Sequence, residues 1–406
     1  YWKLKQSPRL TRIAVMPGNG GIPPQDQIPL MVPGSDELRD LVKREGFELI
    51  VSGPEQPLVE GWLDGLRDIC PVFGPTQSAA ALEGSKSFAK EFMQRQGIPA
   101  ARSRSFADFA SALLYVKERR PPYVIKADGL AAGKGVSICA SQEEAEQALS
   151  RTMQELVFGA AGSRVVIEDY LAGQEVSLFA LSDGKNSMPF VALQDHKRAF
   201  DGDEGPNTGG MGAYQPVPFV THDLLKKIND RILQPTIQGM AREGRPYRGL
   251  LYMGLMIVND EPFVIEYNVR FGDPETQALM PVVAEDLLAL LYEAAAGTLP
   301  DRPVQIKNQA SLTVVVAAEG YPGEYPRNLE LKNIDRMEGD IIFFHAGTVR
   351  SGDGCRSSGG RILNVTALGK DLVEARERAY GALADLDCPG TFYRQDIGSK
   401  GIVIRS

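Results

Sequence analysis

The segment FVIEYNVRFGDPETQ, residues 263–277, combines the pattern of a buried strand with acidic, amide and basic side chains. Strand residues two apart point to the same face, so Glu266 and Asn268 share one face. Carboxylate and amide oxygens are the ligands that a hard cation held among phosphates prefers. Arg270 continues the alternation, where it could neutralise charge developing on a transferring phosphoryl group. Taken alone, the segment fits a strand end with a solvated acidic face equally well.

The strand of this segment has an expected partner immediately before it. Residues 249–258 indicate a buried strand, which pairs with residues 263–267 across the turn at Asn259 and Asp260. An amphipathic helix at residues 221–242 precedes this pair, with apolar side chains at helical spacing. The pattern therefore predicts a helix followed by an antiparallel hairpin.

Further from this segment, the first eighty residues alternate short strands with helices. Strands are expected at residues 13–16, 47–52 and 72–74, and this alternation predicts a small doubly wound parallel α/β domain. Loops that follow such strands carry ligand contacts, which draws attention to residues 17–20 and 53–55. Ordinary turn chemistry accounts for either loop taken alone.

A glycine-rich loop follows the strand expected at residues 123–126. Its sequence is ADGLAAGKGV, residues 127–136. Glycine lets backbone N–H groups approach oxygens and lysine supplies a point charge, so the loop suits a flexible cover over polyphosphate. It is not a Walker loop and does not satisfy the Rossmann fingerprint; a structural hairpin is the alternative. Lys86 lies in the first turn of a helix capped by Ser85, where an anionic partner explains a cation better than the helix dipole does.

Two polar stretches, DHKR at residues 195–198 and GPNTGGMG at residues 205–212, cannot build a core. A loop of this length inside a compact protein is normally functional or disordered, and we interpret it as a binding surface for a small polar substrate. A lone histidine such as His196 is more often a structural hydrogen-bonding group than a base. The strand at residues 164–168 and its connector could contact an adenine edge, with Glu175 reaching ribose hydroxyls, although acidic residues beside a turn are usually just solvated.

Composition limits the class of protein. With 406 residues, two to four subdomains are expected, and 43% apolar with 24% charged residues is typical of a soluble globular protein. The net charge of −8 argues against a nucleic-acid surface. The four cysteines show no paired spacing, which indicates free thiols in a reducing compartment and no zinc site. No apolar run approaches the ~18 residues of a membrane span.

The last hundred residues indicate a separate α+β lobe. Strands are expected at residues 311–318, 341–345 and 362–367, and a closing helix near residues 372–386. We find no internal repeats or low-complexity tracts in the sequence.

These motifs together resemble the glycinamide ribonucleotide synthetase (phosphoribosylamine-glycine ligase) family of the ATP-grasp superfamily. The resemblance spans essentially the whole chain and rests, in order, on GPEQPLVEG, LEGSK, VIKADGLAAGKGV, QDHKR, GPNTGGMGAY, VIEYNVRFGDPETQ and FHAGT. VIKADGLAAGKGV alone indicates only an ATP-grasp protein, whereas GPNTGGMGAY with RFGDPETQ narrows the resemblance to the ligase.

The resemblance implies an ATP-grasp fold of class α/β and α+β. Its expected parts are an N-terminal doubly wound parallel α/β domain at residues 1–82, an ATP-grasp domain at residues 83–303 with a mobile lid at about 104–174, and a C-terminal α+β domain at residues 304–406. Members of the family begin with a β-strand and a loop resembling GNGGREH. This sequence begins inside the helix that follows, and we expect the missing first strand to belong to the natural chain.

The implied activity is ATP-dependent ligation of glycine to 5-phospho-D-ribosylamine in purine (IMP) biosynthesis, through glycyl phosphate. It requires Mg²⁺ or Mn²⁺, and we expect a cytoplasmic monomer that acts on small molecules and binds neither nucleic acid nor membrane. Water must be kept from the acyl phosphate by a closing lid. The alternatives are another ATP-grasp carboxylate-amine ligase with a different acceptor, and a catalytically impaired ATP-binding remnant.

The resemblance also assigns residues by motif. The catalytic residues are Arg270 and Lys126, and the metal ligands are Glu266 and Asn268. ATP is assigned to Lys86, Lys126, Gly129, Gly133, Lys134, Gly135, Glu168, Leu171 and Glu175. Glycine and phosphoribosylamine are assigned to Asn19, Glu55, Asp195, His196, Lys197, Asn207, Thr208, Gly209, Asp273, Pro274 and Glu275. The metal set is incomplete, because the neighbouring strand at residues 250–258 offers no carboxylate.

Overall fold

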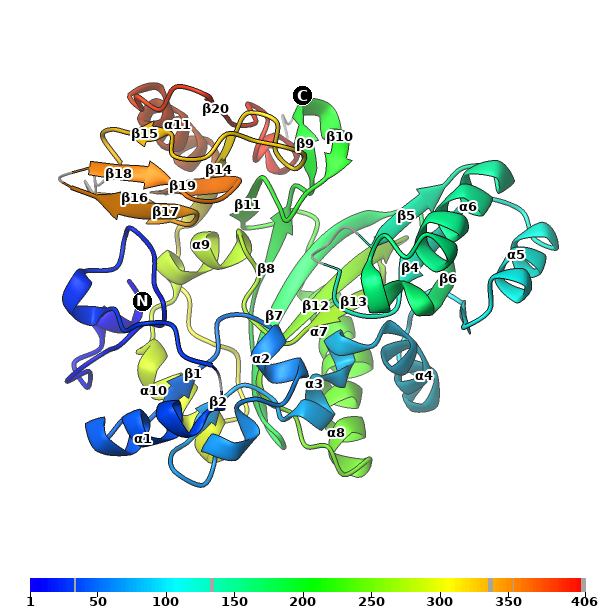
Figure 1. Ribbon diagram of the computed structural model, residues 1–406, viewed down its shortest axis with the longest axis horizontal. Helices are drawn as coiled ribbons and strands as arrows, with labels where there is room; N and C mark the ends of the chain where they lie inside the picture. Colours follow the sequence, from blue (N-terminus) through cyan, green and yellow to red (C-terminus); the bar gives the residue numbers. More distant parts are fainter. Residues whose placement is uncertain (33, 132–134, 335–338, 353, 403–406) are drawn as a thin grey trace.

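The computed structural model describes residues 1–32, 34–131, 135–334, 339–352 and 354–402 (Figure 1). One large sheet runs through the molecule in the strand order β13-β12-β7-β8-β11-β14-β19-β16, and β20 pairs with β14. Its strands are β7 (Gln174–Asp183), β8 (Ser187–Asp195), β11 (Gly212–Gln215), β12 (Arg248–Val258), β13 (Glu261–Asn268), β14 (Ala310–Ala318), β16 (Ile341–His345), β19 (Arg361–Gly369) and β20 (Thr391–Phe392).

The expected hairpin is confirmed in this sheet. β12 and β13 pair antiparallel from Val258 opposite Glu261 onward. Asn259 and Asp260 both have positive φ, which is the geometry of a two-residue turn matched to strand twist. The preceding helix is α7 (His222–Ile228) and α8 (Gln234–Arg242), joined without a break through a π-helical turn.

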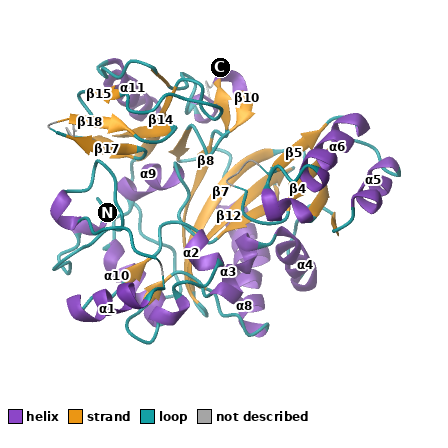
Figure 2. Cartoon of the chain, viewed as in Figure 1, coloured by secondary structure: helices purple, strands orange, loops and turns teal. Residues whose placement is uncertain are grey.

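A second sheet projects from the body of the molecule (Figures 1 and 2). It is antiparallel in the order β3-β6-β4-β5 and has its own apolar core. Its elements are β3 (Ser103–Phe106), β4 (Tyr123–Ala127), β5 (Val136–Cys139), β6 (Val165–Asp169), α5 (Phe109–Lys117) and α6 (Gln142–Leu149). The site described below lies where this projecting sheet faces the β12–β13 hairpin.

The N-terminal region contains a parallel pair, as the alternation predicts, but with fewer strands. Its elements are β1 (Ile50–Val51), β2 (Val72–Phe73), α1 (Asp36–Glu45), α2 (Gln56–Val59), α3 (Gln77–Gly84) and α4 (Lys86–Gln96). The prediction of a strand at residues 13–16 is wrong, because Val15 forms only an isolated bridge with Gln27. Pro17 and Pro29 follow the two bridging segments and have no N–H with which to extend a ladder.

The C-terminal lobe, expected as a separate unit, is joined to the rest of the large sheet by backbone hydrogen bonds. β11 pairs with β8 on one side and with β14 on the other, so the large sheet continues into the lobe. The lobe adds α11 (Leu372–Ala384), which packs on β14 and β19, and a small sheet of β15 (Glu330–Leu331), β17 (Thr348–Ser351) and β18 (Gly354–Ser357).

The polar stretch at residues 195–212, expected as one long loop, also contains strands. β9 (Arg198–Phe200) and β10 (Glu204–Asn207) form a short antiparallel pair before β11 begins. Two further helices, α9 (Glu275–Leu279) and α10 (Leu287–Ala296), follow the β12–β13 hairpin. No disulfide joins the four cysteines, all of which lie in the described residues. The described helices include none that could cross a membrane.

Candidate active site

A β-bulge in the β12–β13 hairpin shapes the centre of the site. Glu266 lies opposite Gly254 and Val264 opposite Leu255, so Ile265 is an extra residue on β13. The backbone oxygen of Ile265 accepts a hydrogen bond of 2.9 Å from Lys126 Nζ. The bulge therefore ties the hairpin to β4 of the projecting sheet.

Lys126 belongs to a buried trio of charges. Its Nζ lies 2.9 Å from one carboxylate oxygen of Glu168, and Lys90 Nζ lies 2.9 Å from the other. Burial lowers the pKa of Lys90 to about 8 despite this pairing. Burial alone would raise the pKa of Glu168, but the two lysines outweigh it and the pKa is lowered. The Glu168 side chain is 3% exposed, so its ion pair with Lys126 lies in the protein interior and fixes the position of the Lys126 side chain.

Glu266 lies among several cations. Lys197 Nζ is 3.8 Å from its carboxylate. Burial would raise the pKa of Glu266, but Lys197, Lys126 and Lys86 are the largest opposing influences and keep it below its ordinary range. Arg270 acts in the same direction. Lys126, Lys197 and Arg270 also pair with the carboxylates of Glu168, Glu175 and Glu55, so the site holds its cations in fixed positions where an anionic ligand could contact them.

The described residues contain no group of three or more His, Cys, Asp or Glu side chains that could hold a metal ion. Glu266 and Asn268 share one face of β13, as the alternation predicts, and both are partly exposed. Mg²⁺ is often bound by one or two protein ligands together with substrate phosphates and water. This pair therefore fits a cation that arrives with a phosphate ligand, and does not form a complete metal cage.

Arg270 is held by two carboxylates from the N-terminal region. Its Nε donates to Glu55 at 3.2 Å, and its Nη2 lies 4.0 Å from Glu83. Glu83 also accepts a 2.6 Å hydrogen bond from the backbone N–H of Val269. Burial raises the pKa of Glu83 to about 7, although Arg270 and the Val269 hydrogen bond oppose the shift.

The glycine-rich loop is fastened at its start to the N-terminus of α4. Lys86 Nζ donates to the carbonyl of Gly129 at 2.8 Å. Asp128 accepts hydrogen bonds of 3.1 Å from the Ser85 hydroxyl and the Ser87 N–H. At the other end, the Gly135 carbonyl accepts from Ala127 N–H at 2.9 Å. The predicted ligands Gly133 and Lys134 lie outside the described residues.

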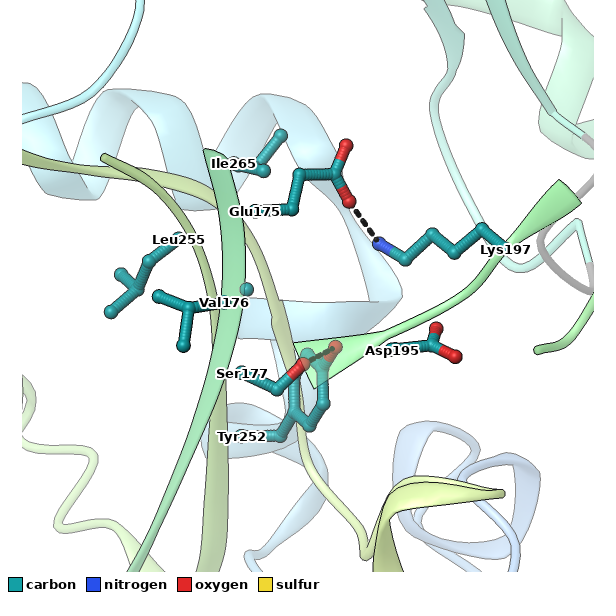
Figure 3. A pocket seen from close by; sticks show the side chains of 9 residues that line it. Glu175, Val176, Ser177, Asp195, Lys197, Tyr252, Leu255 and Ile265 are labelled. Atoms are coloured by element: carbon teal, nitrogen blue, oxygen red, sulfur yellow. Dashed lines mark hydrogen bonds and ion pairs between the residues drawn. The ribbon is translucent and has the colours of Figure 1, made fainter. Parts of the chain in front are cut away.

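A small pocket opens beside these groups (Figure 3). Val176, Leu255 and Ile265 form an apolar part of its lining. Glu175 reaches toward Lys197, and their ion pair measures 3.2 Å. The volume of this pocket is about 10 Å³, which is room for about one water molecule beside the paired charges.

Acidic and hydroxyl groups line the other side of the pocket. The hydroxyls of Ser177 and Tyr252 share a hydrogen bond of 2.9 Å, and Ser177 donates to buried Glu275 at 3.2 Å. Burial, followed by the charge of Glu275, raises the pKa of Asp195 well above its ordinary value. The Asp195 carboxylate lines this pocket, where a cationic amine would favour its charged form.

The polar loop is fixed by its own hydrogen bonds. Thr208 donates from its N–H and its hydroxyl to the Lys197 carbonyl, at 2.8 and 2.9 Å. His196 is 1% exposed, and its Nδ1 lies 3.4 Å from the Gly212 carbonyl. Burial, then Arg394, lowers the pKa of His196 to about 4, so the imidazole is neutral. This geometry agrees with a structural role for His196.

Asn19, predicted to bind substrate, contacts the C-terminal lobe. Its amide donates to the carbonyl of His345 at 2.8 Å, and its oxygen accepts from Gly21 N–H at 3.0 Å. This glycine-rich segment therefore docks on the C-terminal lobe. Leu171 lies partly exposed in the turn between β6 and β7.

Sequence reasoning missed Glu83, Lys90 and Tyr252. Lys90 follows Lys86 by four residues, so helical spacing places both on one face of α4 and could have indicated it. Glu83 lies on the buried face of α3, a helix that the sequence analysis did not predict. Tyr252 stands in an apolar strand, where nothing in the pattern separates it from core residues.

Comparison with known proteins agrees with this geometry. Sequence models of phosphoribosylglycinamide synthetase match its N domain at residues 1–83, its ATP-grasp (A) domain at residues 84–276 and its C domain at residues 311–400. The phosphoribosylamine-glycine ligase of Rhizobium meliloti is 47% identical over 404 residues, covering 99% of this chain and 95% of the relative. That of Leptospira interrogans serovar copenhageni is 45% identical, covering 98% and 95%.

Among solved structures, the phosphoribosylamine-glycine ligase of Thermotoga maritima superposes with a TM-score of 0.82 at 37% identity, covering 94% of this chain and 92% of that one. The expected ATP-grasp fold is thereby confirmed. The family models together cover nearly all of the described chain, and the relatives match over almost their whole length. The chain belongs to the phosphoribosylglycinamide synthetase family.

Proposed function

We propose that the protein ligates glycine to 5-phospho-D-ribosylamine at the expense of ATP, giving glycinamide ribonucleotide, ADP and phosphate for purine biosynthesis. The observation that carries the proposal is the convergence of Lys86, Lys126, Lys197 and Arg270 around Glu266. Ammonium and guanidinium groups gathered in this way can donate charge-assisted hydrogen bonds to the phosphate oxygens of a nucleoside triphosphate. The identity of the two other substrates, glycine and phosphoribosylamine, is inferred from the family to which the chain belongs.

The ATP phosphates would lie against Lys86 and Lys126, beneath the loop that begins at Gly129. The nucleoside would lie beside Leu171 and Glu175, with Glu175 near the ribose. Because each carboxylate oxygen of Glu168 is paired with a lysine, we infer that Glu168 acts by holding Lys126.

Glu266 and Asn268 would hold Mg²⁺ or Mn²⁺. Such an ion, when bound, neutralises charge on the phosphate oxygens during transfer. The protein's own contribution is placement, since both ligands project from one face of a strand whose bulge also fixes Lys126. Arg270, oriented by Glu55 and Glu83, adds positive charge over the group in transfer.

The reaction would proceed in two steps. An oxygen of the glycine carboxylate attacks the γ-phosphorus, and ADP leaves, which converts a poor acyl donor into glycyl phosphate. The amine of phosphoribosylamine then attacks the carbonyl carbon and displaces phosphate, with loss of one proton. Asp195 and Glu275 provide the acidic surroundings for an amine, and Asp273, Pro274, Asn207 and Gly209 lie on the adjoining loops.

The domain limits also remain proposals. We infer units at residues 1–82, 83–303 and 304–406, with residues 104–174 closing over ATP as a lid. The projecting sheet and the β12–β13 hairpin, which together form the site, both lie within residues 83–303. We further propose that the protein acts as a cytoplasmic monomer on small molecules.

Isotope incorporation tests the proposed reaction. The protein is incubated with ATP, Mg²⁺, phosphoribosylamine and ¹⁵N-glycine, and the products are analysed by mass spectrometry. One ¹⁵N in glycinamide ribonucleotide, formed in equal amount to ADP, supports the proposal. Product formed with another amine or carboxylate, and none with glycine and phosphoribosylamine, would indicate a different carboxylate-amine ligase.

A further inference from the structure

Arg361, the first residue of β19, joins the C-terminal lobe to two loops of the site. Its Nη1 donates to the carbonyls of Gly209, Gly210 and Asp273, at 2.9, 3.3 and 2.7 Å. Its Nη2 donates to the Asp273 carboxylate at 3.1 Å. One guanidinium therefore contacts both the glycine-rich segment before β11 and the turn after β13.

The two loops meet at a point with no spare room. A Cβ atom on Gly210 would lie 2.3 Å from Pro274 Cδ and 2.9 Å from Asp195 Oδ1. A Cβ atom on Gly209 would lie 2.9 Å from Arg361 Nη2. Small changes in either loop would therefore displace the Asp195 carboxylate, because the three segments are in direct contact.

We propose that Arg361 is a positioning residue for the glycine and phosphoribosylamine side of the site, and that the site is incomplete without the C-terminal lobe. The inference rests on the proposed function for the identity of these substrates. Arg361 acts by fixing the loops that carry Gly209, Asp273 and, through Gly210, Asp195.

The chemistry of the contact requires arginine. Three backbone carbonyls and a carboxylate converge on one planar group, and the fork of donors in a guanidinium can satisfy several acceptors at fixed angles. A lysine carries the same charge at a single point on a flexible stem, so it would restore the charge and only part of the geometry. The side chain is 20% exposed, which limits replacement of these contacts by water.

The sheet explains why the lobe can act on these loops. Arg361 lies in register opposite Ala317 of β14, and Gly212 of β11 lies opposite Val314 of the same strand. The arginine and the end of the glycine-rich segment are thus fixed to one shared strand. The contact belongs to the start of a paired strand and not to a surface loop.

Steady-state kinetics of Arg361→Met and Arg361→Lys test the inference, with Arg376→Met as the matched control. Arg376 also donates to backbone carbonyls in the same lobe, those of Ile397 and Gln395, but it lies on α11. For Arg361→Met we expect the KM for glycine or phosphoribosylamine to rise at least about tenfold while the KM for ATP changes less than about twofold. Arg361→Lys should fall between this variant and the wild type.

Hydrogen exchange tests the same contact without turnover. Amides of the segment at residues 207–212 are hydrogen-bonded, for example Gly210 N–H to the Thr208 hydroxyl at 2.9 Å. Arg361→Met should increase exchange of peptides spanning this segment about fivefold or more, and Arg376→Met should not. Because this readout is independent of the reaction, a wild type that fails to ligate glycine would contradict the proposed function alone.

Two results would overturn the inference. One is unchanged exchange at residues 207–212 together with unchanged KM values in Arg361→Met. The other is an equal loss in Arg361→Met and Arg376→Met, which would mean that general weakening of the lobe is the cause.

Discussion

Replacing Glu83 with glutamine should change how the stability of the protein depends on pH. Glu83 is 9% exposed, and its pKa is raised to about 7, first by burial and then by the charges of Glu55 and Glu266. The folded protein therefore binds more protons than the unfolded chain between about pH 4.5 and pH 7. Stability is lost as the pH rises through this interval, and the loss is complete above pH 7.

The magnitude follows from the two pKa values. A rise from 4.5 to about 7 corresponds to about 3.4 kcal/mol at 1.36 kcal/mol per pH unit. About 0.8 kcal/mol of this cost is already present at pH 5, so roughly 2.5 kcal/mol develops between pH 5 and pH 8. Glu83→Gln removes this titration, while its amide can still face the Val269 N–H.

Urea denaturation at pH 5 and pH 8 measures the effect. The free energy of unfolding of the wild type, relative to that of Glu83→Gln, should fall by about 2.5 kcal/mol between the two pH values. Glu60→Gln, at the exposed carboxylate that follows α2, is the control for the substitution itself. Wild-type and Glu83→Gln profiles that stay parallel within about 0.5 kcal/mol would refute the reasoning about burial.

Three further substitutions probe the rest of the site. Glu266→Ala should abolish glycine-dependent ADP release while leaving the thermal midpoint within about 2 °C, because the side chain is partly exposed; unchanged turnover would refute the metal assignment. Gly210→Ala places a Cβ atom 2.3 Å from Pro274 Cδ at a φ of +113°. We expect it to destabilise the protein by about 1–3 kcal/mol and to lower kcat/KM at least tenfold. Wild-type stability and wild-type kcat/KM in this variant would show that the space around Gly210 is not crowded. Lys90→Met removes one partner of buried Glu168, which should cost about 3 kcal/mol in urea denaturation; a cost below about 1 kcal/mol would mean that the remaining pair suffices.

Local patterns predicted the parts of the fold that depend on neighbouring residues. The β12–β13 hairpin follows from two apolar runs around Asn259 and Asp260, and Ser85 caps α4 by accepting from Phe88 N–H at 3.1 Å. Alternation along β13 correctly placed Glu266 and Asn268 on one face. In each case the relevant partners are close in sequence, so periodicity and turn chemistry suffice.

Features that depend on distant segments could not be predicted from these patterns. The strand expected near Val15 forms only an isolated bridge with Gln27, because Pro17 and Pro29 follow the two bridging segments and cannot extend a ladder. The bulge at Ile265 is visible only in the register with β12. Arg361 follows Gly209 by about 150 residues, and only the folded sheet brings them together. Motif resemblance supplied the ligand assignments that spacing alone left open.

ADP release tests the central claim most directly. The purified protein is supplied with Mg²⁺, ATP, glycine and freshly made phosphoribosylamine, and each component is omitted in turn. We predict ADP release that requires all four components. ATP binding without turnover in the complete mixture, or turnover that persists without glycine, would contradict the assignment of this site to glycine ligation.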